Sequence, residues 1–377
     1  MPLVLLTLLV SAAASAEQAY HPTLGYWIDA PTNWEPMGTG SETVVAFSDP
    51  SDRAVLQIMS FESDRFDAAA DIGTHIRERL SATGDLARFT YLGRDAALAD
   101  FRFDGPGGTM RGYFVFLDHP FADHAAFAYV VESAYEDAHD LLLSALDSFA
   151  PTARARRTPG PVSAFLAEGA GDRWQQREIE GPFGPMTVSL DIDGVTDSQT
   201  LIEREARILS LFQAGGRLQA GWQEAWRRFY RMIYRDSYER LTPLADALRL
   251  ELEEEEVPRE EIPAVLLDWL QTFEFRRTGS LSDLAAPTTC LLEMAGDCDG
   301  LGVLYTVLLH QLGFDAVLMV SLRHAHALVG VDVEGPGARF PYRERQYLVA
   351  ELTDDVDIGM IAASMADPAD WLGIHFR

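Results

Sequence analysis

Residues 151–161, PTARARRTPGP, interrupt the pattern of apolar residues along the chain. The segment is rich in proline and arginine and has no apolar period, which is typical of a connection between domains. The 377 residues also exceed the usual size of one hydrophobic core. We therefore expect a domain at residues 17–150, a linker at 151–161 and a second domain at 162–377.

The first 16 residues, MPLVLLTLLVSAAASA, have the pattern of a signal peptide. An apolar stretch from Leu3 to Val10 is followed by small residues up to Ala14-Ser15-Ala16, an A-x-A cleavage pattern. The alternative is a membrane-anchoring helix, but a span needs about 20 apolar residues. No later segment is long and apolar enough to cross a bilayer. We expect an exported protein, periplasmic or extracellular, without a membrane span in the mature chain.

The chain is strongly acidic, with 58 Asp and Glu residues against 30 Lys and Arg, for a formal net charge of -28. Such a surface repels polyanions, which argues against nucleic acid and anionic lipid as principal partners. The acidic run ELEEEEVPREE at 251–261 fits a solvated helix end and loop better than a metal site. We expect neither a metal nor another cofactor.

The first block, residues 20–149, mixes strand and helix patterns. Strands are predicted at GYWIDAPTNWEPM, TVVAFSD, AVLQIMSFE, ALADFRFD, MRGYFVFLD and AAFAYVVESAY, and helices at DAAADIGTHIRERLSATG and DAHDLLLSALDSF. This order predicts an α+β sandwich with an antiparallel sheet. The opening GYWIDAPTNWE, the Tyr- and Phe-rich strands and the helix ending in SFAP resemble the PsbP-like α-β-α sandwich. That resemblance implies a small exported binding module. The histidines of this block, His21, His75, His119, His124 and His139, are scattered and predict no catalytic constellation.

The segment after the linker is largely helical. REIEGPFGPMTVSLDIDG predicts a hairpin or extended segment, and EIPAVLLDWLQTFEF predicts a helix. Between them, QAGWQEAWRRFYRMIYRDSYERLTPLADALRLEL carries aromatic and leucine residues at helical spacing, broken at Pro243. An aromatic stripe of this kind is typical of a core.

The stretch GDCDGLGVLYTVLLHQLG places Cys298 at the start of another helix. Its leucines and Tyr305 form one helical face, and Gly313 has the position of a C-terminal glycine. Asp297 can serve as N-cap, and Cys298 then lies in the first turn, where free N–H groups and the helix dipole favour a thiolate. Asp297 and Asp299 oppose this effect, because nearby negative charge disfavours a second anion. A cationic neighbour is needed to ionise the thiol.

Two later segments offer that neighbour. FDAVLMVSLRHAHALVGVDV and QYLVAELTD have the composition of strands, and an antiparallel pairing centred near Ala338 and Arg339 sets His326 opposite Glu351. A thiol at a helix N-terminus, an imidazole on one strand and a carboxylate on the next have the order of a Cys-His-acid triad. His324 is the alternative base.

These residues resemble the transglutaminase-like superfamily of papain-type folds, in GDCDG, HALVGV and YLVAELTD together with the upstream DWLQTFEF. The resemblance implies a helical lobe packed on an antiparallel sheet, with Cys298 as nucleophile, His326 as base and Glu351 as orienting acid. It also implies hydrolysis of peptide or isopeptide bonds in a peptide or protein substrate. Leu328 and Glu351 stand where many members have Trp and Asp, so the substrate is less well defined than the triad.

Three alternatives remain open. The second domain can be an inactive scaffold that binds an envelope protein partner, or Cys290 and Cys298 can form a disulfide. A metal site built from Cys298, His324 and His326 is the third, although the spacings of known zinc sites are absent. We expect Cys290 to be free and packed on a short helix, and Cys298 to be partly ionised near neutral pH.

Overall fold

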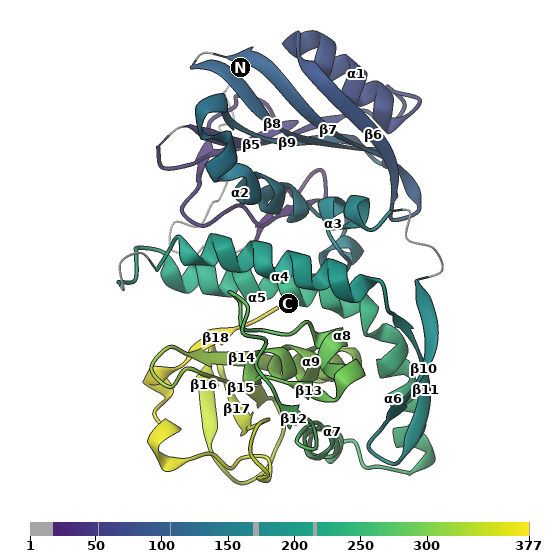
Figure 1. Cartoon of the computed structure of the whole chain (residues 1–377), viewed down its shortest axis with the longest axis vertical. Coiled ribbons are helices and arrows are strands. Elements are labelled where there is room, and N and C mark those ends of the chain that lie inside the picture. Colours follow the sequence, from purple (N-terminus) through teal and green to yellow (C-terminus); the bar gives the residue numbers. More distant parts are fainter. Residues whose placement is uncertain (1–17, 52, 106, 169–172, 214–216, 377) are drawn as a thin grey trace, which may run out of the picture.

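The computed structural model describes residues 18–376 except 52, 106, 169–172 and 214–216. The predicted signal peptide at 1–16 lies outside the described residues. Figure 1 shows the N-terminal half at one end of the long axis and the C-terminal half at the other, with helices α4 (Gly194–Ser210) and α5 (Trp222–Arg240) between them.

The N-terminal half is built on a seven-stranded antiparallel sheet of order β3-β4-β5-β9-β8-β7-β6. Helix α1 (Ala69–Leu80) packs on one face of the sheet and α2 (Tyr135–Asp147) on the other. The strands are β3 (Glu35–Met37), β4 (Val44–Ser48), β5 (Ala54–Phe61), β6 (Thr83–Tyr91), β7 (Arg94–Gly105), β8 (Gly108–Leu117) and β9 (Asp123–Val131). A short pair, β1 (Ala19–Tyr20) and β2 (Trp27–Ile28), precedes them.

Side chains of the central strands alternate between two hydrophobic cores, one on each face of the sheet. In β8, Val115 and Leu117 join the cluster under α2, whereas Phe114 and Phe116 join the cluster under α1. Successive side chains of a strand point to opposite faces of the sheet, so a central strand covered on both faces is apolar at nearly every position. This arrangement confirms the predicted α+β class with an antiparallel sheet.

Strand β6 was not predicted from the sequence. It lies at the edge of the sheet, and most of its side chains are exposed, with Phe89 and Tyr91 buried near its end. An edge strand that faces solvent has no regular apolar alternation, so the periodicity used to find the other strands is missing here.

The segment predicted as a linker is ordered. Residues Arg154–Arg157 form a 3-10 helix, and α3 (Pro161–Leu166) follows directly. Ala155 and Thr158 are buried, and Val162 packs into the core under α2. The change from one hydrophobic core to the next therefore falls after α3 rather than at residue 161.

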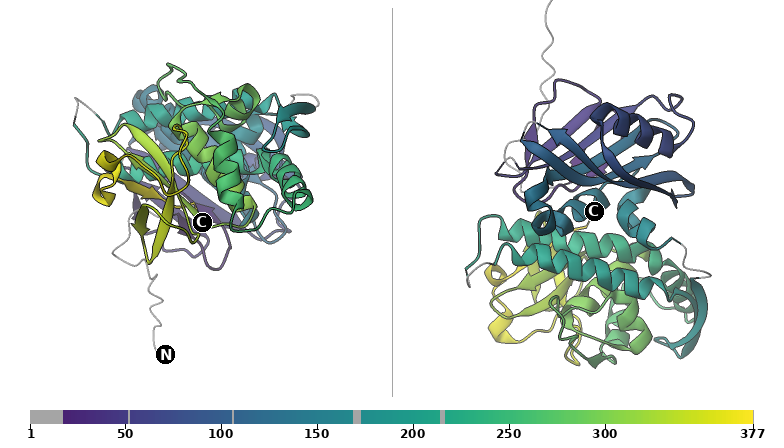
Figure 2. Two further views of the ribbon diagram at one scale, coloured as in Figure 1. Left: turned by 90° about the horizontal axis from the view of Figure 1, so that it is seen from below. Right: turned by 45° about the horizontal axis from the view of Figure 1, so that its top comes forward.

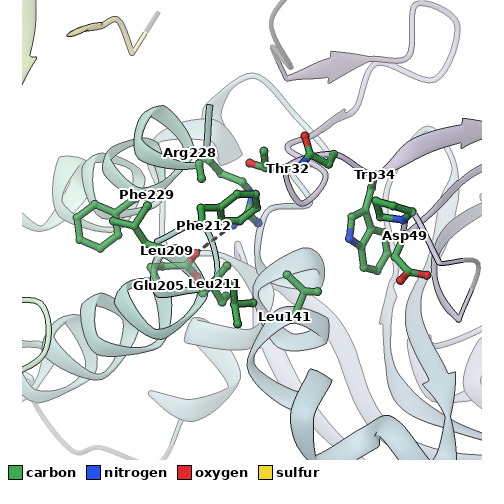
Figure 3. A pocket seen from close by; sticks show the side chains of 14 residues that line it. Thr32, Trp34, Asp49, Leu141, Glu205, Leu209, Leu211, Phe212, Arg228 and Phe229 are labelled. Carbon is green, nitrogen blue, oxygen red and sulfur yellow. Dashed lines mark hydrogen bonds and ion pairs between the residues drawn. The ribbon is translucent and has the colours of Figure 1, made fainter. Parts of the chain in front are cut away.

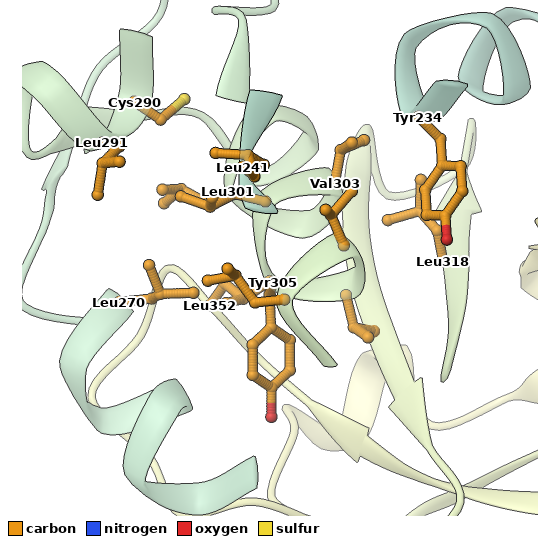
Figure 4. Packing of buried hydrophobic residues seen from close by; sticks show 14 of the residues in the cluster. Tyr234, Leu241, Leu270, Cys290, Leu291, Leu301, Val303, Tyr305, Leu318 and Leu352 are labelled. Carbon is orange, nitrogen blue, oxygen red and sulfur yellow. The ribbon is translucent and has the colours of Figure 1, made fainter. Parts of the chain in front are cut away.

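The C-terminal half packs helices against a five-stranded antiparallel sheet of order β16-β17-β15-β14-β18. The strands are β14 (Ala316–Ser321), β15 (His326–Val331), β16 (Arg339–Tyr342), β17 (Arg345–Ala350) and β18 (Leu372–Ile374). Helix α9 (Cys298–Gln311) lies on this sheet, and its apolar residues join one cluster with the neighbouring helices (Figure 4). Those neighbours are α5, α6 (Thr242–Glu254), α7 (Ile262–Leu270) and α8 (Pro287–Glu293).

Two small sheets complete this half. The predicted hairpin is formed by β10 (Trp174–Glu180) and β11 (Pro185–Asp191). Strands β12 (Glu274–Phe275) and β13 (Ala295–Gly296) pair in parallel immediately before α9.

Helix α6 has Pro243 in its first turn, which confirms the predicted break after α5. No helix formed by residues 18–376, outside the short gaps, has the length and apolar character needed to cross a membrane.

Helices α4 and α5 lie between the two halves (Figure 2). Buried charged side chains on these helices connect the halves. Arg228 and Arg231 of α5 bind the backbone oxygen and the carboxylate of Asp29, and Arg204 of α4 binds Asp147 at 2.7 Å. Arg235 donates to the backbone oxygens of Asp147, Phe149 and Thr158. Buried charges require partners of this kind, so the two halves are fixed to each other.

Candidate active site

Cys298 begins α9, as the sequence predicted. Asp297 is the N-cap, and its side chain accepts a hydrogen bond from the Gly300 backbone N–H at 2.9 Å. The cysteine side chain is mostly buried, with 7% of its surface exposed. The local sequence therefore sets both the start of the helix and the place of the thiol in its first turn.

Cys290 supports this turn from α8. It is fully buried, and a Cβ added to Gly296 or Gly300 would lie 2.7 Å or 2.9 Å from its sulfur. The two glycines of the GDCDG motif thus make room for the Cys290 side chain. Both cysteines are free thiols, and burial raises the pKa of Cys290.

His326 and Glu351 are in direct polar contact. His326 begins β15, and its Nε2 lies 2.7 Å from Oε2 of Glu351, which directly follows β17. The other carboxylate oxygen of Glu351 accepts hydrogen bonds from the backbone N–H and the hydroxyl of Thr353, at 2.9 Å and 2.8 Å. Glu351 is buried, and these three donors fix its carboxylate in place.

The strand register differs from the predicted one by two residues. Val329 pairs with Ala350, so continuing the ladder would place His326 opposite Thr353 rather than Glu351. A shift of two residues keeps every side chain on the same face of the sheet, whereas a shift of one would reverse it. The predicted contact forms for this reason, although the predicted register was wrong.

Hydrogen bonding shifts both pKa values of this pair. Burial alone would lower the pKa of His326, but the hydrogen bond and charge of Glu351 outweigh it and raise that pKa. Burial alone would raise the pKa of Glu351, but His326 and Thr353 outweigh it and lower that pKa. Both shifts favour the ion pair of an imidazolium with a carboxylate.

This pair should make protein stability depend on pH. The raised pKa of His326 adds to the free energy of unfolding in full below its unfolded pKa of about 6.5, and this stabilisation is lost as the pH rises through the folded pKa. The lowered pKa of Glu351 adds to the free energy of unfolding above its unfolded pKa of about 4.3, and this stabilisation is lost as the pH falls through the folded pKa. Urea unfolding from pH 3 to 9 should therefore show the largest difference between wild type and Glu351→Gln between about pH 4.3 and 6.5.

The control for this experiment is Glu344→Gln, which removes an exposed carboxylate from the hairpin of β16 and β17. Its effect on the free energy of unfolding should be small at every pH. A Glu351→Gln effect that does not vary with pH would contradict the ion pair.

The thiol of Cys298 is directed to a different partner. Its sulfur donates to Oδ2 of Asp299 at 3.6 Å, and among the described residues no hydrogen bond joins it to His326. Burial, followed by the charges of Asp299 and Asp297, raises the thiol pKa, while the backbone N–H of Ala327 acts in the opposite direction. The expectation of a partly ionised thiol near neutral pH is therefore wrong for this arrangement.

His324, the alternative base, has its own carboxylate. It lies in the turn between β14 and β15, its Nε2 is 3.1 Å from Asp370, and its ring stacks on Trp371 with centroids 5.6 Å apart. His326 instead stands on the strand that packs against α9. The described part of the chain contains no group of three or more His, Cys, Asp or Glu side chains suited to hold a metal ion, including the Cys298, His324 and His326 set.

Sequence reasoning did not assign a role at this site to Tyr230. Its hydroxyl donates to Oδ1 of Asp299, and its side chain is 1% exposed. Tyr230 belongs to the aromatic stripe of α5, which the spacing assigned to the core. No local signal separates it from its apolar neighbours, because the contact joins residues 69 positions apart.

A separate pocket of ≈ 210 Å³ lies between the two halves (Figure 3). Its lining includes Trp34 and Phe212, with Arg228 and Glu205 on its wall. These two charges bind each other at 3.0 Å, and both also bind Ser144. Arg228 and Glu205 thus help to hold the two halves together, and the pocket contains none of the predicted site residues.

No protein-family model matches the chain, and no curated protein matches it. Among solved structures, cyanobacterial PsbP from Synechocystis sp. PCC 6803 aligns with the N-terminal part at 14% identity and a TM-score of 0.30, covering 37% of this chain and 94% of that one. The Pseudomonas aeruginosa protein PA94, of unknown function, aligns at 16% identity and 0.22, covering 26% and 74%.

A Bacteroides thetaiotaomicron protein aligns with most of the chain, covering 86% of this chain and 88% of its own, at 9% identity and a TM-score of 0.27. All three TM-scores lie below 0.5. Similarity at this level does not carry activity or partners from one chain to another. The residues of the site are therefore the guide to function.

Proposed function

We propose that this protein is an exported, transglutaminase-like cysteine hydrolase of the papain type, which cleaves peptide or isopeptide bonds with Cys298, His326 and Glu351. The single observation that carries the proposal is the 2.7 Å contact between His326 Nε2 and Glu351. His326 lies on β15, the strand that packs against the helix that Cys298 begins. In this proposal the N-terminal half is a PsbP-like sandwich that accompanies the catalytic half.

The ring orientation of His326 suits a base. Because Nε2 is bound to Glu351, Nδ1 is the nitrogen left to take the thiol proton. Among the described residues, none forms a hydrogen bond with Nδ1. Glu351 fixes the tautomer of the ring and stabilises the imidazolium that forms. Thr353 holds Glu351 in turn, so the base is oriented by two successive sets of contacts.

The proposed reaction has two steps, acylation of the thiol and hydrolysis of the thioester. The Cys298 proton moves to His326, the thiolate attacks the carbonyl carbon, and the imidazolium returns the proton to the leaving amine as the C–N bond breaks. Water then gives a proton to His326 and attacks the thioester, which releases the acid and restores the thiol. Backbone N–H groups at the start of α9 can stabilise the oxyanion of each tetrahedral intermediate.

The second candidate is a catalytically inactive scaffold that binds an envelope protein. The raised thiol pKa and the hydrogen bond from Cys298 to Asp299 favour it, because both keep the sulfur protonated. The two candidates share one fold and differ in whether the thiol reaches His326.

A screen of peptide and isopeptide substrates separates the two candidates. The wild-type protein should hydrolyse at least one substrate, and Cys298→Ala should abolish that activity because the nucleophile is gone. Cys290→Ala is the matched control, since it removes the other thiol from a neighbouring helix and should retain activity per folded molecule. Hydrolysis that survives Cys298→Ala would contradict the proposal, and the absence of hydrolysis across the screen would favour the scaffold.

A further inference from the structure

We propose that Asp299, held by Tyr230, is a brake on the nucleophile: it accepts the hydrogen bond of the Cys298 thiol and keeps the sulfur protonated in the resting protein. This regulation rests on the proposed function, because it acts on the nucleophile of the same site. The sequence already indicated that the charge of Asp299 opposes ionisation of the thiol, and the structure adds the hydrogen bond from the thiol and the contact with Tyr230.

The geometry places Asp299 between two donors. Its Oδ2 accepts from the Cys298 sulfur at 3.6 Å, and its Oδ1 accepts from the Tyr230 hydroxyl. Tyr230 is buried on α5, which contacts α9, so a second donor holds the Asp299 carboxylate. The hydrogen bond turns the S–H group toward Asp299, and the proton must leave this contact before His326 can take it.

Two carboxylates beside the thiol, Asp299 and Asp297 of the N-cap, favour the protonated sulfur. The charge of His326 on β15 also acts on Asp299, in the direction that lowers the pKa of its carboxyl group. The segment between β12 and α8 contributes Arg277, which is paired with Asp283. Burial, opposed by the hydrogen bonds from Tyr230 and Cys298, raises the pKa of Asp299. A thiolate would form beside two carboxylates in a poorly solvated site, where like charges repel strongly.

Activation requires the S–H group to turn from Asp299 to His326. The proton then passes to the imidazole, leaving a thiolate and an imidazolium, with no change in the number of protons at the site. The imidazolium is held by Glu351, and the thiolate is stabilised by the start of α9. Asp299 remains bound to Tyr230 throughout.

Asp299→Asn tests the brake directly. Asparagine removes the charge but keeps a side-chain oxygen that can accept from Tyr230. Alkylation by iodoacetamide, followed by peptide mass spectrometry across pH 6 to 10, should show the Cys298 midpoint lowered by about one pH unit and its rate at pH 7.5 raised about tenfold. Cys290 is the internal reference, and Asp283→Asn is the matched control, since it removes a carboxylate that contacts Arg277 rather than the thiol.

Each outcome separates the brake from the proposed function. A Cys298 rate that is unchanged or lower in Asp299→Asn overturns the brake. A higher rate that His326→Ala abolishes in the same background supports both ideas, and a higher rate that survives His326→Ala supports the brake while removing the triad. If Asp299→Asn does not fold, the wild-type profile decides: a Cys298 midpoint above the ordinary value of about 8.5 supports the brake, and one at or below that value overturns it.

Discussion

Under the proposed hydrolase function, His326→Ala should lower kcat/KM for a peptide or isopeptide substrate by about 10²–10⁴-fold, the range that a positioned general base contributes. The loss should fall on kcat, because the imidazole acts on the thiol proton and the leaving amine rather than on substrate binding. Glu351→Gln should cause a smaller loss, since glutamine can still contact Nε2 but cannot stabilise the imidazolium with a charge. Steady-state kinetics of the purified variants measures both effects.

His324→Ala is the matched control for the base. It removes an imidazole two residues away whose Nε2 is bound to Asp370 and whose ring stacks on Trp371. This variant should keep most of the activity. If His324→Ala instead loses as much kcat as His326→Ala, the base has been assigned to the wrong histidine.

Asp147→Ala should destabilise the protein by about 3–5 kcal/mol, the range observed when one partner of a buried ion pair is removed. The Asp147 side chain is fully buried and accepts hydrogen bonds from Arg204 at 2.7 Å and from the backbone and hydroxyl of Ser163 at 2.9 Å and 2.6 Å. Burial alone would raise the pKa of Asp147, but Arg204 and Ser163 outweigh it and lower that pKa. The alanine variant leaves the Arg204 guanidinium without one of its two carboxylates, the other being Glu205.

The same two helices provide the control. Asp140 of α2 binds Arg207 of α4 at 2.6 Å, but this pair is solvent-exposed, and Asp140→Ala should cost no more than about 1 kcal/mol. Replacing the buried pair together, as Asp147→Leu with Arg204→Met, should recover much of the lost stability because no unpaired charge is left. Urea unfolding measures all three variants, and equal losses for Asp147→Ala and Asp140→Ala would contradict the buried role of Asp147.

The elements of the site could be predicted from the sequence because their signals are local. The cap at Asp297, the start of α9 at Cys298 and the strand that His326 begins are each encoded within a few consecutive residues. The contact between His326 and Glu351 was also predictable, because a strand has a period of two and the register error kept both side chains on one face.

The surroundings of the thiol depended in part on a residue distant in the chain. The charge of Asp299 within the GDCDG motif was expected to oppose ionisation, but Tyr230 binds Asp299 from another helix, a contact that no spacing within the motif predicts. The connection between the halves has the same origin. The segment at 151–161 has the composition of a flexible linker, yet it packs beside α5, whose Arg235 binds the backbone oxygens of Thr158 within the segment and of Phe149 just before it. Composition reports what a segment favours by itself, whereas burial and long-range hydrogen bonds arise only when the chain has folded.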